Sequence, residues 1–159
     1  MSTAVFPGSF DPVTTGHMDL ICRAAGMFDS LVLGVLINNA KQPFFTVEER
    51  VEMLQELTQE FSNITVKSFD GLLVDFVEQE QAQVRVRGLR TAVDFEYELP
   101  LAQANYKLNK NADTVFLATA PEHSFISSSA VKELVRFGGD ISMMVPDSVK
   151  KRIGDKLQQ

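Results

Sequence analysis

The chain has 159 residues, of which 45% are apolar and 23% charged, as is ordinary for a globular protein of one domain. Its formal net charge of −6 argues against a general nucleic-acid-binding protein, because such proteins usually present a basic face. The N-terminus lacks the basic and long apolar segments of a signal peptide, and the longest apolar run, 31–37, is too short to cross a bilayer. We therefore expect one cytoplasmic domain over residues 1–159 that binds neither nucleic acid nor membrane.

The first third of the chain predicts two strands, each followed by a helix. Apolar runs at 4–6 and 31–37 predict the strands, and the continuous second run is typical of a parallel strand covered on both faces. The first helix should begin near His17, and its sole cysteine, Cys22, is expected to be a small buried apolar side chain. Thr46 and Glu49 have the spacing of a capping box, which predicts a second helix ending near Phe61.

The middle third repeats this alternation twice. Short strands are predicted at 64–66 and 84–87, separated by a helix whose apolar face includes Leu72 and Leu73. The segment Gly88-Leu89-Arg90 should be the loop that leaves the fourth strand. A long helix then begins near Thr91, and Pro100 within it predicts a kink or a break.

The last third predicts a fifth strand at 114–117 and two helices. Residues 118–125 should form a loop, and a helix over 126–136 should end at Gly138-Gly139. A final helix should start near Pro146, with Val149, Ile153 and Leu157 on one face. The fold class is therefore α/β, a Rossmann-like doubly wound parallel sheet of five strands with helices on both faces and a C-terminal helix.

The predicted strands bring polar residues to one edge of the sheet. In open parallel sheets, ligands bind beyond the carboxyl ends of the strands. The residues expected at that edge are cationic or carry hydroxyl groups: Ser9, His17, Lys41, Arg87, Arg90, Ser127, Ser128 and Ser129. This set has no cluster of His and Cys that would hold a metal, and it suits phosphoryl or nucleotidyl transfer, where positioning and charge stabilisation do most of the work.

The segment 6–17, Phe-Pro-Gly-Ser-Phe-Asp-Pro-Val-Thr-Thr-Gly-His, joins the first strand to the first helix. It contains neither the G-x-G-x-x-G pattern of dinucleotide-binding folds nor the Gly-Lys-Ser/Thr of phosphate-binding loops. Its Thr-x-Gly-His end resembles the "HIGH"-type motif of the nucleotidyltransferase superfamily. Together with Arg87-Gly88-Leu89-Arg90 and the block 125–129, Phe-Ile-Ser-Ser-Ser, the whole chain resembles the phosphopantetheine adenylyltransferase family.

That resemblance implies a reaction and a set of site residues. ATP and 4′-phosphopantetheine would give dephospho-coenzyme A and pyrophosphate, with Mg²⁺ as cofactor and no confident metal ligand from the protein. His17, as transition-state stabiliser, would act with Lys41 and Arg90. ATP would be bound by Ser9, Phe10, His17, Gly88, Leu89, Arg90, Glu98, His123, Ser124, Phe125, Ile126, Ser127, Ser128 and Ser129, and the acceptor by Ser9, Lys41, Leu73 and Arg87.

The same resemblance implies a homohexamer built as a dimer of trimers and feedback inhibition by coenzyme A. Apolar residues near 36–37 and at Phe44-Phe45 are the only sequence sign of assembly. The chain departs from the family at Ser9, where threonine is usual, and at His123, where some relatives carry a bulky aromatic residue. We expect the second departure to weaken stacking on adenine and to leave the chemistry intact.

Each site residue also has a plainer interpretation from the sequence. His17 and one of the three serines could only cap helices, Lys41 could be a solvated loop residue, and Glu98 could be a surface helix residue. Leu73 could belong to the core, and Arg85, which shares a face with Arg87, is expected to be structural or at the rim. Asp11 is expected to form a turn, with a weaker alternative as a metal ligand.

Three other functions remain as alternatives. The nearest is a small nucleotidyltransferase with a different phosphate acceptor, such as nicotinamide mononucleotide. A catalytically silent ATP-sensing module is a second, and an aminoacyl-tRNA synthetase fragment is a third. The third is disfavoured because we expect a complete protein of 159 residues without a tRNA-binding part.

Overall fold

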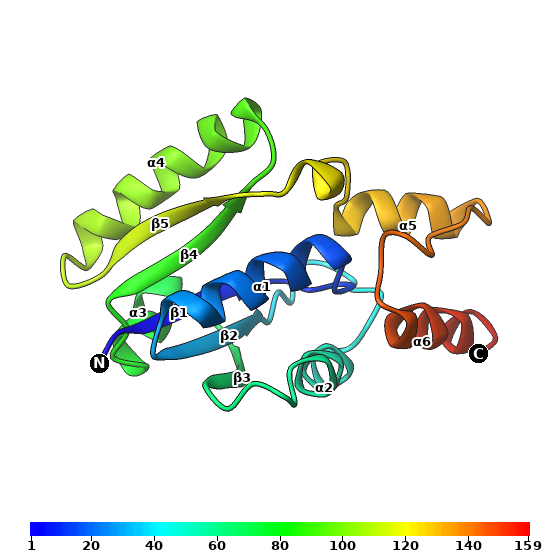
Figure 1. Ribbon diagram of the computed structural model, residues 1–159, viewed down its shortest axis with the longest axis horizontal. Coiled ribbons are helices and arrows are strands. Elements are labelled where there is room, and N and C mark those ends of the chain that lie inside the picture. Colours follow the sequence, from blue (N-terminus) through cyan, green and yellow to red (C-terminus); the bar gives the residue numbers. More distant parts are fainter.

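The computed structural model describes all residues, 1–159. Its elements alternate as predicted (Figure 1): β1 (Thr3–Gly8), α1 (Thr15–Met27), β2 (Ser30–Leu36), α2 (Val47–Leu57), β3 (Ile64–Phe69), α3 (Leu73–Gln79), β4 (Val84–Leu89), α4 (Ala92–Leu108), β5 (Asp113–Ala118), a 3₁₀ turn η1 (Pro121–His123), α5 (Ser128–Arg136) and α6 (Asp147–Leu157). No helix is both long enough and apolar enough to span a membrane.

The sheet has five parallel strands in the order β3-β2-β1-β4-β5. The chain therefore winds outward in one direction from β1 to β3 and in the other from β4 to β5. The point at which the winding reverses lies between β1 and β4, where open α/β sheets bind their ligands. The predicted doubly wound α/β fold is confirmed, and its topology places the ends of β1 and β4 side by side.

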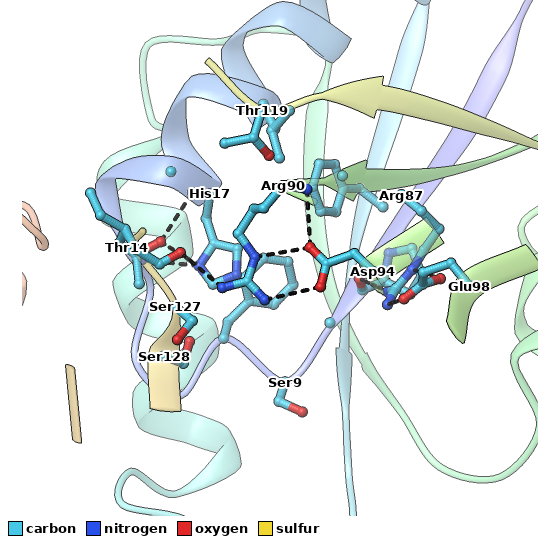
Figure 2. A pocket seen from close by; sticks show the side chains of 18 of the residues that line it. Ser9, Thr14, His17, Arg87, Arg90, Asp94, Glu98, Thr119, Ser127 and Ser128 are labelled. Atoms are coloured by element: carbon cyan, nitrogen blue, oxygen red, sulfur yellow. Dashed lines mark hydrogen bonds and ion pairs between the residues drawn. The ribbon is translucent and has the colours of Figure 1, made fainter. Parts of the chain in front are cut away.

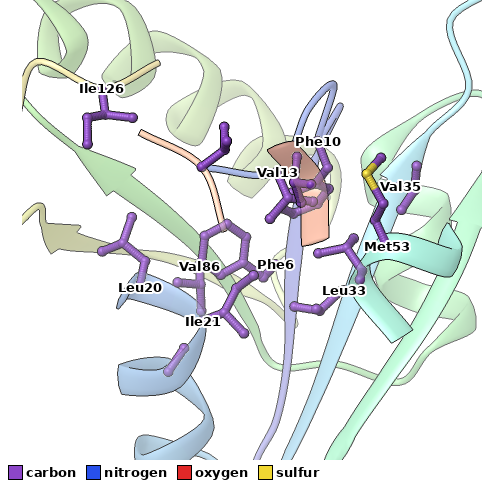
Figure 3. Close-up of a cluster of buried hydrophobic side chains, with 14 of the residues drawn as sticks. Phe6, Phe10, Val13, Leu20, Ile21, Leu33, Val35, Met53, Val86 and Ile126 are labelled. Atoms are coloured by element: carbon purple, nitrogen blue, oxygen red, sulfur yellow. The ribbon is translucent and has the colours of Figure 1, made fainter. Parts of the chain in front are cut away.

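Side chains of β1 alternate between two cores, as expected for a strand covered on both faces. Ala4 and Phe6 belong to a large cluster with α1, α2, α5 and α6, whereas Val5 belongs to a smaller one with α3. Figure 3 shows the large cluster, in which Phe10 from the loop after β1 lies among strand and helix residues. This packing fixes the loop that begins at Ser9.

The ends of the elements differ from the predictions at several places. Gly88 and Leu89 belong to β4 instead of the loop after it, and they pair with Leu117 and Ala118 of β5. A Cβ atom at Gly88 would collide with Leu20 of α1, so glycine lets this helix pack against the strand. The helix α2 ends at Leu57, before Phe61, because Thr58 forms its C-cap. The helix α4 runs through Pro100 without a break.

Four predictions about where apolar residues and Cys22 lie were wrong or partly wrong. Cys22 is exposed, because the core-facing side of α1 is formed by Leu20, Ile21, Ala24 and Ala25. Leu72 precedes α3 as its N-cap and is exposed, and Leu157 is exposed in the last turn of α6. Phe45, expected as a sign of assembly, is buried in the protein's own core, and Phe44 packs against it.

Candidate active site

Two cavities lie at the edge of the sheet between β1 and β4, where the winding of the chain reverses. The first, of about 310 Å³, is lined by the loop after β1, the start of α1, the end of β4 and the start of α5. The second, of about 500 Å³, lies between the ends of β1 and β4, α3 and α4. Both are lined by Pro7, Gly8, Ser9, Arg87, Tyr97 and Glu98. The site therefore has two compartments, and the Ser9 hydroxyl and the Arg87 guanidinium belong to the wall that they share.

His17 is held by the start of its own helix. Its backbone N–H donates to Thr14 Oγ1 at 3.1 Å, and the Thr14 N–H donates to His17 Nδ1 at 3.0 Å, so the imidazole completes a capping box. Burial, with the Arg90 and Arg87 guanidiniums nearby, lowers the pKa of His17 to about 4. At neutral pH the ring is uncharged and Nδ1 is an acceptor, which leaves Nε2 as its donor. The helix-cap interpretation and a role in the site are thus both compatible with the geometry.

The two predicted arginines of β4 and its exit are each paired with a carboxylate of α4. Arg87 donates from Nε and Nη2 to the two oxygens of Glu98, at 2.9 and 2.6 Å, and from Nη1 to the Pro7 carbonyl at 3.1 Å. Arg90 donates from Nε to Asp94 Oδ2 at 3.2 Å. Figure 2 shows Arg90 between His17 and Asp94, with Ser9 and Thr119 on opposite sides of it. These pairs orient the guanidiniums before any anion is bound.

Glu98 is not the surface residue that helix position alone suggested. It is the only buried residue among the 17 of α4, and both of its carboxylate oxygens accept hydrogen bonds from Arg87. Asp94, which sequence reasoning missed, lies one turn earlier on the same helix and lines the first cavity. The available signal was its place three residues after the capping residue Thr91, because acidic residues favour the first turn of a helix.

The three serines before and within α5 have different surroundings. Ser127 is the N-cap, and its side chain accepts a hydrogen bond from the Ala130 N–H. Ser128 Oγ donates to the Pro12 carbonyl at 2.8 Å, and Ser129 is exposed. Ser127 and Ser128 line the first cavity. The unpaired N–H groups of the first turn of α5 therefore lie at its wall, where an anion would be stabilised.

Most of the predicted site residues line these cavities. Those of the first cavity are Ser9, Phe10, His17, Arg87, Gly88, Arg90, Glu98, Ile126, Ser127 and Ser128, and Leu73 lines the second. The remaining predicted residues line neither: Lys41, Leu89, His123, Ser124, Phe125 and Ser129. Lys41 is exposed on the loop after β2, and Ser124 Oγ donates to the Pro121 carbonyl. Thr119, also unpredicted, lines the first cavity with a buried Oγ1 that has no partner.

The buried side chain of Arg50 connects the loops that follow β1 and β2 to the start of α2. Arg50 of α2 donates from Nη1 to the carbonyl oxygens of Ser9 and Leu36, at 2.8 and 3.1 Å, and from Nε to that of Phe45 at 3.2 Å. Asp11 adds a second connection, because its two carboxylate oxygens accept hydrogen bonds from the N–H groups of Phe44 and Phe45 at 2.8 Å each. Asp11 therefore anchors the loop before α2, and neither cavity includes it.

The chain has no group of three or more His, Cys, Asp or Glu side chains arranged to hold a metal ion. The two carboxylates of the first cavity, Asp94 and Glu98, are each engaged by an arginine. A magnesium ion at this site would therefore take most of its oxygen ligands from a bound phosphate chain and from water.

Comparisons with known proteins agree on the family. The model of the family "Cytidylyltransferase-like" matches residues 5–134. The phosphopantetheine adenylyltransferase of Lachnoclostridium phytofermentans is 52% identical over 98% of this chain and 96% of its own length. Those of Caldanaerobacter subterraneus subsp. tengcongensis (47% identity, 100% and 99% of the two chains) and Synechocystis (51% identity, 92% of each) are similarly close.

Among solved structures, a candidate nicotinate-nucleotide adenylyltransferase from Vibrio parahaemolyticus superposes with a TM-score of 0.71. The alignment covers 99% of this chain and 93% of that one. Because the sequence identity is only 17%, it supports the Rossmann-like fold and nothing more. The sequence relatives are much closer and carry one name throughout. This chain belongs to the phosphopantetheine adenylyltransferase family of nucleotidyltransferases.

Proposed function

We propose that this protein is a phosphopantetheine adenylyltransferase, which transfers the adenylyl group of ATP to 4′-phosphopantetheine and so forms dephospho-coenzyme A and pyrophosphate in coenzyme A biosynthesis. The observation that carries the proposal is the pair of cavities that meet at Ser9 and Arg87. A transfer between two substrates needs two compartments with one shared wall, where the reacting phosphates come together. ATP would occupy the first cavity, and the arm of the acceptor would occupy the second.

The acceptor requires no general base in this scheme. A phosphate monoester has its second pKa near 6, so its terminal oxygens are mostly ionised at neutral pH. One of these oxygens attacks the α-phosphorus of ATP, and the bond from that phosphorus to the β-phosphate oxygen breaks to release pyrophosphate. The task left to the protein is to align the two phosphates and to stabilise the charge that builds between them.

His17 suits that task as a hydrogen-bond donor. Its pKa of about 4 keeps the ring neutral, and the bond from the Thr14 N–H to Nδ1 fixes the proton on Nε2. We assign Nε2 the role of donor to the α-phosphate in the transition state. Arg90, Ser127, Ser128 and the start of α5 would bind the phosphates of ATP, and Arg87 the phosphate of the acceptor. Lys41 would join them if its exposed loop moved over the bound phosphates.

Magnesium is the divalent ion we propose for the reaction. It would enter on the phosphates of ATP and neutralise part of their charge.

We also propose that the protein acts in the cytoplasm as a homohexamer built as a dimer of trimers. Exposed apolar side chains on α4 support an assembly, and they are Val93, Phe95, Tyr97, Leu101, Tyr106 and Leu108. Light scattering should give about six times the 17.7 kDa mass of one chain. A mass near one chain would contradict this assembly. Coenzyme A carries the same arm as the acceptor, so we expect it to compete for the second cavity as a feedback inhibitor.

The direct test measures pyrophosphate release from ATP and Mg²⁺ with a panel of acceptors. Release should require 4′-phosphopantetheine and should be absent with pantetheine, which lacks the phosphate. Nicotinamide mononucleotide and nicotinate mononucleotide test the nearest alternative function. Equal or faster turnover with either one would overturn the proposal.

A further inference from the structure

A third arginine, Arg85, lines the second cavity and has one buried donor that nothing in the protein satisfies. It precedes Arg87 by two residues on β4, so the two side chains share a face of the sheet. Its side chain is 1% exposed, and the residue lines the second cavity together with Thr114 of the neighbouring strand. The sequence predicted a structural or rim position, and the rim alternative is wrong.

Two of the three guanidinium nitrogens of Arg85 have acceptors. Nη2 donates to the Ala112 carbonyl at 2.8 Å, and Nε donates to Thr114 Oγ1 at 3.3 Å. Nη1 is buried and has no partner. A buried donor without an acceptor is unfavourable, so such groups are rare in folded proteins. Burial also lowers the pKa of Arg85, although a guanidinium keeps its charge at any ordinary pH.

Arg87, which we place at the acceptor phosphate, marks one end of this cavity. A strand rises about 3.3 Å per residue, so Arg85 follows Arg87 at roughly 6.6 Å along β4. The first amide carbonyl of a phosphopantetheine arm follows its phosphate at a comparable separation. The rest of the cavity wall is largely apolar, with Leu36, Phe69 and Leu101 among its residues. Arg85 is therefore the charged donor available to the arm beyond the phosphate.

We propose that Arg85 is a specificity-determining residue of the acceptor cavity, and that its Nη1 donates a hydrogen bond to an amide carbonyl oxygen of the phosphopantetheine arm. This inference rests on the proposed function. Nη1 is closed to water, so the arm reaches it only when a lining side chain moves. Leu72, which precedes α3, lines this cavity and is 60% exposed, so it leaves room for such movement.

The test compares two phosphate ligands of the acceptor cavity, one with amide groups and one without. Arg85→Met replaces the guanidinium with an unbranched apolar side chain that has no donor. Arg85→Lys keeps the positive charge but lacks the planar guanidinium group. Initial rates with ATP and 4′-phosphopantetheine give KM for each substrate. Neopentyl phosphate, which carries the phosphate and branched carbon of the arm without an amide, is measured as a competitive inhibitor against 4′-phosphopantetheine. Arg152→Met is the control, because Arg152 pairs with Glu52 and Glu56 far from both cavities.

Arg85→Met should raise KM for 4′-phosphopantetheine about ten- to a hundredfold, the effect expected for a hydrogen bond from a charged donor. KM for ATP and the inhibition constant of neopentyl phosphate should stay within about twofold. Arg85→Lys should lie between Arg85→Met and the wild type, and its activity keeps the test valid if Arg85→Met does not fold. Unchanged acceptor KM in a folded variant, or an equal loss for both phosphates, would overturn the inference. A wild-type protein that is inactive with 4′-phosphopantetheine would instead overturn the proposed function.

Discussion

The two cavities differ in how their polar side chains are held. In the first, Arg90 is paired with Asp94, His17 is held by Thr14, and Ser128 is bonded to Pro12. In the second, Arg85 keeps an unused donor, and the wall is largely formed by apolar residues and by a helix that buries one side chain. The first cavity is thus organised before a ligand arrives, as electrostatic catalysis requires. The second has a charged donor, Arg85 Nη1, without a partner, whereas the unpaired buried atom of the first is the neutral hydroxyl Thr119 Oγ1.

The largest expected effect tests the organised cavity through His17. His17→Ala should lower kcat by about 10²–10³, the usual cost of one donor to a developing negative charge, while ATP binds within about tenfold. His17→Gln is the matched variant, because glutamine at this position can complete the capping box with Thr14. Stopped-flow turnover, ATP affinity and melting temperature are measured on both. A folded His17→Ala protein with near-normal kcat would show that His17 is a helix cap and nothing more.

The second prediction concerns the charge of the same ring. The pKa of His17 is about 4 in the folded protein and near 6.5 when unfolded, so the unfolded state takes up its proton first as the pH falls. The stabilisation linked to this residue is complete above pH 6.5 and is lost between pH 6.5 and 4, by up to about 3 kcal/mol. Urea unfolding of wild type and His17→Gln isolates it, because the other titrating groups are shared. A difference in unfolding free energy that did not change with pH would show an ordinary, unshifted histidine.

The third prediction separates the two substrates. Arg87→Ala and Lys41→Ala should each weaken 4′-phosphopantetheine more than ATP, by about 1.5–3 kcal/mol or one to two orders of magnitude. Arg87→Ala also leaves the buried Glu98 carboxylate without its partner, so the double variant with Glu98→Gln is the control for misfolding. Isothermal titration with each substrate gives the comparison. If both variants lost ATP binding alone, the two substrates would occupy the opposite cavities.

The smallest expected effect lies outside both cavities, at Cys22. Because this side chain is exposed, Cys22→Ser should change the free energy of unfolding by less than about 0.5 kcal/mol and leave turnover unchanged. Partial burial and the neighbouring Asp19 raise the pKa of the thiol, so its reaction with a disulfide reagent should speed up at a higher pH in the native than in the unfolded protein. A loss of stability above about 1 kcal/mol would restore the prediction of a buried cysteine.

The sequence by itself determined the order of the elements, the parallel sheet and the edge at which the site lies. Hydrophobic periodicity and capping patterns are local, and Thr46 with Glu49 shows how a few residues can set the start of a helix. The three motif blocks also identified the family, because they record chemistry that depends on residue type. Ser9, His17, Arg87 and Arg90 could therefore be assigned to one edge before any contact was known.

Only the tertiary structure decided which partners these residues have. The pairing of Arg87 with Glu98, the spare donor of Arg85 and the position of Lys41 outside both cavities depend on how α4 and the loops lie over the sheet. The outward position of Cys22 depends in the same way on the rotation of α1 about its axis. Such contacts join residues from separate elements, and a single sequence carries no periodic signal for them. The fold follows from local patterns, whereas burial and charge pairing at the site follow from packing.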